Sequence, residues 1–152
     1  MPHGCFEQTT SITYPNVLTL DYMKKTKQVS PELQMKAEGF VSAGYQRLLT
    51  FETSTPGGFS LYGRQPPVLL LTAYGLMELS DMSSVYNVDA GLLERMRMWL
   101  SSQQDKDGSW GGGLASFILE GEWLIQDLHQ HVLYLGALPE VRTQVYKGLK
   151  SI

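Results

Sequence analysis

A weak internal repeat, with a spacing of 51 residues, is the feature that most restricts how this chain can fold. In each unit a helical segment ends, a Gly-x-aromatic turn follows, and another helical segment begins. A repeat of this size is typical of helical hairpins that stack side by side. The sequence therefore predicts an all-α fold built from such hairpins. The matched positions are Leu49 with Leu100, Gly57 with Gly108, and Phe59 with Trp110.

Start and stop signals delimit six expected helices. The first covers residues 7–27 and contains Pro15, which lacks a backbone donor and disfavours a straight helical run. A second begins at Ser30-Pro31-Glu32, where a capping residue precedes a proline and an acid. Apolar residues then recur at helical spacing: Leu33, Ala37, Phe40, Val41, Gly44, Leu48 and Phe51. Further helices are expected from Pro67 to about Ser80, from the Asp89 cap to Gln104, over about 115–136, and over about 140–150.

The only cysteine of the chain stands three residues before a glutamine, in a segment that runs Gly-Cys-Phe-Glu-Gln-Thr-Thr-Ser from Gly4 to Ser11. The Cys5 sulfur can displace ammonia from the Gln8 side-chain amide and leave an internal thioester. Gly4 supplies the backbone freedom for a tight turn into the first helix. The acyl carbon at Gln8 is then open to attack by an amine, a hydroxyl or water, in a reaction related to nucleophilic acyl transfer. The alternative is that Cys5 is a small buried thiol.

This segment and its continuation resemble the thioester domain of the α2-macroglobulin and complement family, whose signature is Gly-Cys-x-Glu-Gln. The continuation comprises Tyr14-Pro15-Asn16-Val17 and Leu20-Asp21-Tyr22. A bulky apolar residue at x and Thr-Thr-Ser after the glutamine are similar to bacterial-type members. The resemblance implies a thioester between Cys5 and Gln8. It also implies that four neighbours support the motif: Gly4, Phe6, Glu7 and Tyr14.

The same resemblance implies an α/α toroid, the fold of terpenoid cyclases and prenyltransferases. Residues 57–60, 71–74 and 107–110 are similar to the family's hairpins, and Phe59 and Trp110 are expected to plug the ends of helix pairs. The resemblance covers residues 2 to about 110 and weakens beyond Gly111. We therefore expect residues 1–152 to be one partial thioester-containing domain. Six helices cannot close the ring, and an incomplete toroid exposes apolar surface that favours self-association.

The implied function is protease inhibition without enzymatic activity. In the family, cleavage of a bait segment elsewhere exposes the thioester, which then crosslinks the protease through its lysine amines. The implied partners are proteases and neighbouring macroglobulin domains of a longer chain, in an extracellular, periplasmic or cell-envelope location. Family members shelter the thioester partly with aromatic residues of a neighbouring domain, and Phe6, Tyr14 and Phe59 offer only an incomplete substitute. We therefore expect Cys5 to be a free thiol in the isolated chain.

The histidines bear on the choice of nucleophile. Fast complement-type members use a histidine shortly after the Asp-Gly-x-aromatic turn to form an acyl-imidazole that favours hydroxyl groups. The corresponding region, near Phe117, contains no histidine, so direct attack by amines is expected. His129 and His131 lie at i and i+2 on an expected helix and point to different faces, which argues against a metal site formed by this pair. His3 is close enough in sequence to raise the thiolate fraction of Cys5.

Other classes of function stay open at this stage. They are complement-like tagging of surfaces, a cysteine acyl-transferase that pairs Cys5 with His129, a terpenoid-cyclase relative, and an α/α scaffold with an inert Cys-Gln pair. The net charge of −3 and the lack of a basic cluster argue against nucleic-acid binding. No apolar run is long enough to span a bilayer. No cofactor or metal is expected.

Overall fold

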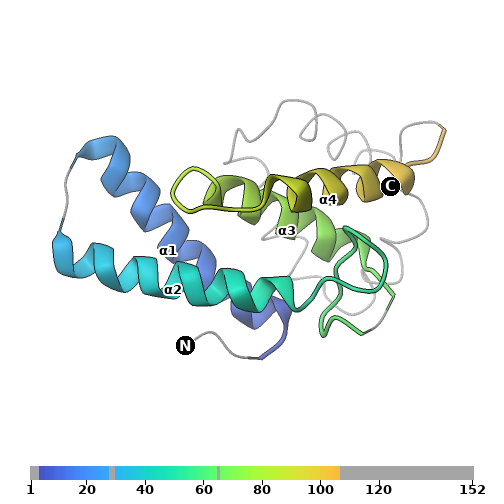
Figure 1. Ribbon diagram of the computed structural model, residues 1–152, viewed down its shortest axis with the longest axis horizontal. Coiled ribbons are helices and arrows are strands. Elements are labelled where there is room, and N and C mark those ends of the chain that lie inside the picture. Colours follow the sequence, from blue (N-terminus) through green and yellow to red (C-terminus); the bar gives the residue numbers. More distant parts are fainter. Residues whose placement is uncertain (1–3, 28–29, 65, 107–152) are drawn as a thin grey trace.

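The computed structural model describes residues 4–27, 30–64 and 66–106, and these residues are helical apart from loops and one isolated antiparallel bridge between Glu52 and Phe59 (Figure 1). Each described helix agrees with its predicted range to within two residues at either end. The predicted helices at 115–136 and 140–150 lie outside the described residues. The four helices are α1 (Phe6–Thr26), α2 (Pro31–Leu49), α3 (Leu69–Met82) and α4 (Ala90–Ser102).

The helices form two antiparallel hairpins, α1 with α2 and α3 with α4 (Figure 1). Helix α1 also packs against α3, so it contacts both α2 and α3. The Tyr45 ring of α2 reaches the loop between α3 and α4, where it meets the Tyr86 ring with centroids 5.5 Å apart. The prediction of stacked helical hairpins is thus confirmed for the described residues.

Local signals explain where the helices begin. Ser30 is the N-cap residue of α2 and Pro31 its first residue, as the sequence predicts, but the Ser30 side chain makes no capping hydrogen bond. At the start of α4, Asp89 accepts a hydrogen bond from the Gly91 amide at 2.9 Å. Helix α1 continues through Pro15, whose side chain is exposed, so that solvent can hydrate the carbonyl left without an amide partner.

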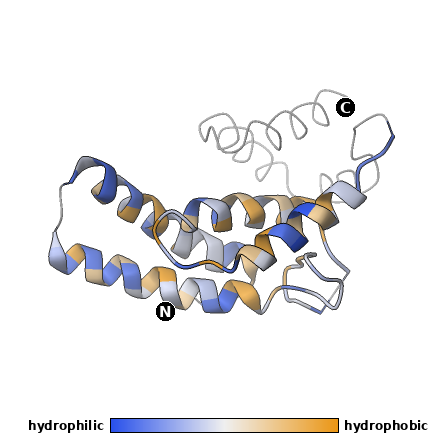
Figure 2. Ribbon diagram, turned by 45° about the horizontal axis from the view of Figure 1, so that its top comes forward, coloured by the Kyte–Doolittle hydropathy of each residue, from blue (hydrophilic) through white to orange (hydrophobic). Residues whose placement is uncertain are grey.

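Helix α2 buries a narrower face than its apolar pattern indicates. Ala37, Val41 and Leu48 are buried against the neighbouring elements. Leu33 and Phe40 belong to the same apolar set but are 49% and 38% exposed. The described neighbours cover only one stripe of the helix, and these two side chains lie at its edges. Figure 2 shows hydrophilic and hydrophobic residues alternating along α1 and α2, as expected for helices with one covered face.

The closest approach of α1 to α2 occurs where Thr13 faces Gly44. A Cβ atom added at Gly44 would overlap the Thr13 hydroxyl and its methyl group. The Thr13 hydroxyl is itself held, because it donates to the Thr9 carbonyl at 2.8 Å. Glycine at this position therefore lets the two helix backbones come together. Gly39, on the same helix, has open space around it.

We predict opposite effects for alanine at these two glycines. Gly44→Ala should lower the free energy of unfolding by about 1–3 kcal/mol, because the new methyl group overpacks the contact with Thr13. Gly39→Ala meets no neighbour and should raise the same quantity by up to about 1 kcal/mol through helix propensity. Urea unfolding of both variants beside the parent chain measures the difference. Equal stabilities of the two variants would contradict the close helix contact.

Candidate functional site

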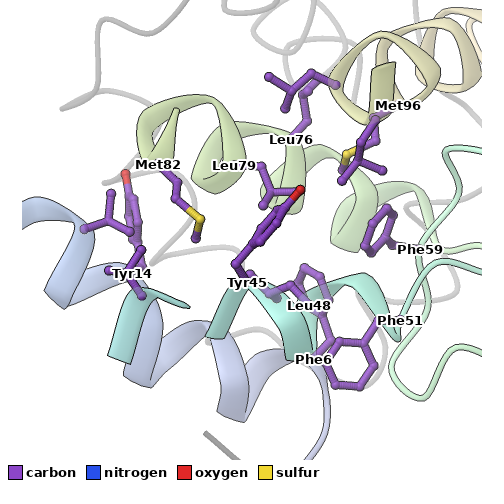
Figure 3. Packing of buried hydrophobic residues seen from close by; sticks show 14 of the residues in the cluster. Phe6, Tyr14, Tyr45, Leu48, Phe51, Phe59, Leu76, Leu79, Met82 and Met96 are labelled. Carbon is purple, nitrogen blue, oxygen red and sulfur yellow. The ribbon is translucent and has the colours of Figure 1, made fainter. Parts of the chain in front are cut away.

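The candidate site lies at the N-terminus of α1, and Phe6 anchors it there. The Phe6 ring is 1% exposed and meets Phe51 and Phe59 edge to face, with centroids 5.8 Å and 6.2 Å away (Figure 3). Its amide donates to the Leu61 carbonyl at 3.0 Å, which satisfies one of the free donors of the first helical turn. A Cβ atom at Gly75 of α3 would come within 3.1 Å of the ring, so glycine makes room for it. The start of α1 is thereby fixed in the aromatic core.

Cys5 and Gln8 face each other across the first turn of this helix. Cys5 is the N-cap residue and Gln8 occupies the third helical position. The Gln8 side-chain oxygen Oε1 accepts a hydrogen bond from the Cys5 backbone amide at 3.2 Å, and the Cys5 side chain faces the Gln8 backbone amide. This is the geometry of a capping box, in which the N-cap and N3 residues satisfy each other's backbone donors. The Cys-x-x-Gln spacing therefore places the Cys5 and Gln8 side chains on the same helical turn, each beside the backbone amide of the other residue.

Gly4 makes the turn possible in the way the sequence predicts. Its φ is +93°, in the left-handed region that favours glycine. A Cβ atom at Gly4 would also overlap the Gln8 side-chain oxygen. The Gln8 side-chain amide therefore occupies the space beside Gly4 that a Cβ atom would fill.

The arrangement has a definite chemical consequence. Attack on the Gln8 side-chain carbon moves negative charge onto Oε1, which the Cys5 amide already meets as a hydrogen-bond donor. A donor held in place before the reaction stabilises such a developing charge. Gln8 is exposed and Cys5 is half-buried, so the carbon is open to nucleophiles from solution.

The other predicted supporting residues are placed differently. Glu7 follows the buried Phe6 in the first turn, and partial burial raises the pKa of its carboxyl. Tyr14 lies two turns further along α1 (Figure 3). Its hydroxyl donates to Asp81 of α3 at 2.7 Å. Burial, and then the bond to Asp81, raise the pKa of the Tyr14 hydroxyl. Phe6 and Tyr14 therefore fasten α1 to the core, and Phe6 lies within the Cys5–Gln8 turn itself.

The sequence interpretation missed one neighbour of the site, Arg47, and a buried acid of the core, Glu78. Arg47, in the last turn of α2, donates to the Gly4 carbonyl at 2.8 Å. Glu78, on α3, is 0% exposed, and neither of its carboxylate oxygens has a hydrogen-bond partner. Nothing in the linear sequence singles out either residue, because an arginine near a helix C-terminus and a glutamate within a helix are both common.

Burial raises the pKa of Glu78 to about 8. The nearby Thr10 hydroxyl opposes this rise and Asp81 adds to it, but the Thr10 hydroxyl makes no hydrogen bond of normal geometry with the carboxylate. Burial therefore dominates, and Glu78 is largely protonated at neutral pH. This group lies in the seam between α1 and α3, which also contains the Tyr14–Asp81 bond.

Several predictions concern residues outside the described part of the chain. These residues are His3, the region near Phe117, His129, His131 and Trp110. Phe59 is described and is fully buried, as a plug at the end of a helix pair would be. Within the described residues, no group of three side chains is suited to hold a metal ion. No described helix combines the length and apolar character needed to cross a membrane.

Comparison with known proteins gives the family. A family model described as the A-macroglobulin TED domain, the thioester domain, matches residues 1–116. The chain is 34% identical over 110 residues to ovostatin homolog 1 from Homo sapiens, and 30% identical over 110 residues to ovostatin from Gallus gallus. The chain therefore belongs to the A-macroglobulin TED domain family.

The matches also bear on the finer expectations. The family is one of protease inhibitors that are not enzymes, in agreement with the sequence interpretation. The matched region covers 71% of this chain in both cases, but only 9% of the human relative and 7% of the chicken relative. Both relatives are animal ovostatins and not bacterial-type members, so these matches do not support the expected bacterial-type grouping.

We predict that Glu78 makes the fold less stable as pH rises. Its carboxyl pKa is about 8 in the folded chain against 4.5 for an unperturbed group, so the folded state binds this proton more tightly. The contribution is greatest below pH 4.5 and is lost as pH rises through 8, by up to about 1.4 kcal/mol per pH unit in between. Glu78→Gln, which cannot ionise, should flatten the dependence of unfolding free energy on pH.

Denaturant unfolding between pH 5 and pH 9, in steps of about one unit, measures this slope. Glu94→Gln is the matched control, because the Glu94 side chain on α4 is 64% exposed. The carboxyls of Asp81 and Glu7 also have raised pKa values, so the unfolding free energy of every variant still depends somewhat on pH. Identical slopes for the parent chain and Glu78→Gln would refute a buried, protonated Glu78.

Proposed function

We propose that this chain is the thioester region of an α2-macroglobulin-like protease inhibitor, which captures proteases covalently through a Cys5–Gln8 thioester. The observation that carries the proposal is the capping-box turn, where the Gln8 oxygen meets the Cys5 amide at 3.2 Å and the Cys5 side chain faces the same residue. Membership of the A-macroglobulin TED domain family supports the same function.

The chemistry proceeds in two balanced steps. In the first, the Cys5 sulfur bonds to the Gln8 side-chain carbon, the bond from that carbon to nitrogen breaks, and the thiol proton leaves with ammonia. In the second, a lysine amine of the protease bonds to the same carbon, the bond to sulfur breaks, and a proton returns to Cys5. Neither step needs an oxidant, a reductant or a metal. The protein is consumed, so it acts as a trap and not as an enzyme.

This function needs more of the protein than one domain. We propose that the hairpins belong to an α/α toroid within a longer, extracellular or periplasmic chain, whose neighbouring macroglobulin domains supply the bait segment and shelter the thioester. Phe6 and the Thr-Thr-Ser that ends at Ser11 favour a bacterial-type member. Phe6, Glu7 and Gly4 support the reactive turn, and Tyr14 fastens its helix to the rest of the domain.

The direct test is the covalent state of the complete macroglobulin chain. The freshly purified protein should have an intact mass lower than the encoded value by one ammonia, and its Cys5 should resist alkylation. Methylamine should add at Gln8 and release one thiol at Cys5. The Cys5→Ser variant is the control and should show neither change. An unmodified Gln8 together with a fully reactive Cys5 would exclude the stored acyl group.

A second test concerns the nucleophile. Because the sequence near Phe117 contains no histidine, no acyl-imidazole relay is expected, and attack should follow the intrinsic strength of the nucleophile. An unprotonated amine should then outcompete glycerol by a wide margin when both are offered to the activated protein. Peptide mapping of the adduct at Gln8 gives the ratio. Predominant ester formation would instead favour complement-like tagging of hydroxyl-bearing surfaces.

A further inference from the structure

Two hydrogen bonds meet at one peptide group beside the reactive turn. The Arg47 nitrogen Nη2 donates to the Gly4 carbonyl at 2.8 Å. The amide of the same peptide unit belongs to Cys5 and donates to the Gln8 oxygen Oε1 at 3.2 Å. A guanidinium cation on α2 is therefore connected, through a single peptide group, to the carbonyl at which the thioester forms and breaks.

The connection has an electronic effect because hydrogen bonds in a chain polarise one another. A charged donor at the carbonyl end of a peptide draws electron density toward the oxygen and makes the N–H end a stronger donor. The donor in question is the Cys5 amide, which faces the atom that gains negative charge in the transition state. Such assistance is larger in the transition state than before the reaction, which is the condition for raising a rate.

The position of Arg47 is itself fixed by the core. Its guanidinium carbon lies 5.0 Å from the centroid of the Phe51 ring, within the range of a cation–π interaction. The Phe51 ring packs in turn against Phe6, the residue next to Cys5. The charge and the reactive turn are therefore held by the same aromatic cluster. The bond from Arg47 also secures Gly4 in its positive-φ conformation.

We infer that Arg47 is a positioning residue for the thioester chemistry, which acts through the Gly4–Cys5 peptide group on the Gln8 carbonyl. The inference rests on the proposed function, since it concerns the reaction of that site. Arg47 forms no covalent bond and transfers no proton. It assists attack on the Gln8 carbon in both steps, by the Cys5 sulfur when the thioester forms and by an amine when it opens.

A purely structural role for Arg47 predicts a different result. A basic residue in the last turn of α2 also stabilises that helix through its dipole. Gln8 is already exposed, so loss of a purely structural contact would only loosen the turn around it, and amines would open the thioester as fast as before or faster. Loss of the positioning role would make the same reaction slower. The sign of the change in rate distinguishes the two roles.

The experiment uses Arg47→Met in the complete macroglobulin chain, because methionine keeps an unbranched apolar stem over Phe51 and removes the charge. Thioester formation, measured as the loss of ammonia from the intact mass, should slow by about tenfold. Opening by methylamine, measured as the release of a thiol, should slow by the same factor. A tenfold change corresponds to about 1.4 kcal/mol in the barrier. Arg47→Lys keeps a charged donor and should show intermediate rates. Arg97→Met is the matched control, since Arg97 pairs with Glu94 in its own helix, and it should not alter either rate.

A second measurement does not depend on a thioester. Because Cys5 is the only cysteine of the 152-residue chain, labelling with nitrogen-15 cysteine gives a single amide signal. In Arg47→Met the Cys5 amide proton should move upfield and exchange faster with solvent, and in Arg97→Met it should stay in place. This readout reports the polarised peptide group even if the parent protein stores no acyl group. The absence of an acyl group would refute the proposed function but not the polarisation of this peptide group.

The inference is wrong if methylamine opens the Arg47→Met thioester as fast as, or faster than, the parent thioester. An unchanged Cys5 amide signal in Arg47→Met would equally overturn it. Circular dichroism and thermal unfolding of each variant establish that the comparison is made between folded proteins.

Discussion

The burial of Phe6 is the constraint on which the reactive turn depends. The ring lies in the core beside Phe51 and Phe59, and it is the first residue of α1 (Figure 3). Successive helical residues are turned by about 100°, so a residue two positions after a buried one faces largely away from the core. Gln8 is exposed for this reason, while Cys5, immediately before Phe6, is half-buried. One anchored aromatic ring thus sets the direction of both the Cys5 and the Gln8 side chains.

The contacts between α1 and α3 extend from Phe6 along α1 and hold that helix in place. Phe6 meets Gly75, and two turns later Tyr14 bonds to Asp81, so the two helices run in the same direction. Glu78 lies between these contacts and is buried without a hydrogen bond to its carboxylate oxygens. A charged carboxylate in such a place is strongly disfavoured, and the group responds by keeping its proton. Burial therefore favours the neutral form of this acid in the folded chain.

The sequence predicts the described helices well because their ends are determined locally. Pro31 and Asp89 act within a single turn, and their signals are visible without any tertiary contact. The extent of burial is less predictable. Leu33 and Phe40 continue the apolar pattern of α2 but stay partly exposed, because the neighbours of the helix, and not its own residues, decide how wide a face is covered.

The same distinction applies to the site. The Cys5–Gln8 turn spans four residues, so motif and geometry coincide, and the spacing alone indicates which two side chains meet across the first helical turn. Arg47 stands 43 positions from Gly4 in the sequence, and only the α1–α2 hairpin brings them together. Glu78 acquires its raised pKa from the helix packed over it. Interactions of this kind depend on tertiary packing, and no local pattern indicates them.

The proposed thioester has to satisfy two opposing requirements, reactivity and protection. The carbonyl oxygen of Gln8 points to a backbone donor, which favours reaction, while the side chain as a whole is exposed, which admits amines and water alike. Nothing within the described residues covers Gln8, whereas Phe6, Tyr14 and Phe59 are all committed to the core. Persistence of the proposed acyl group therefore has to come from residues beyond the described part of the chain or from a neighbouring domain. Under this proposal the Cys5–Gln8 turn supplies the reactivity, and the part of the protein that covers Gln8 determines when the reaction occurs.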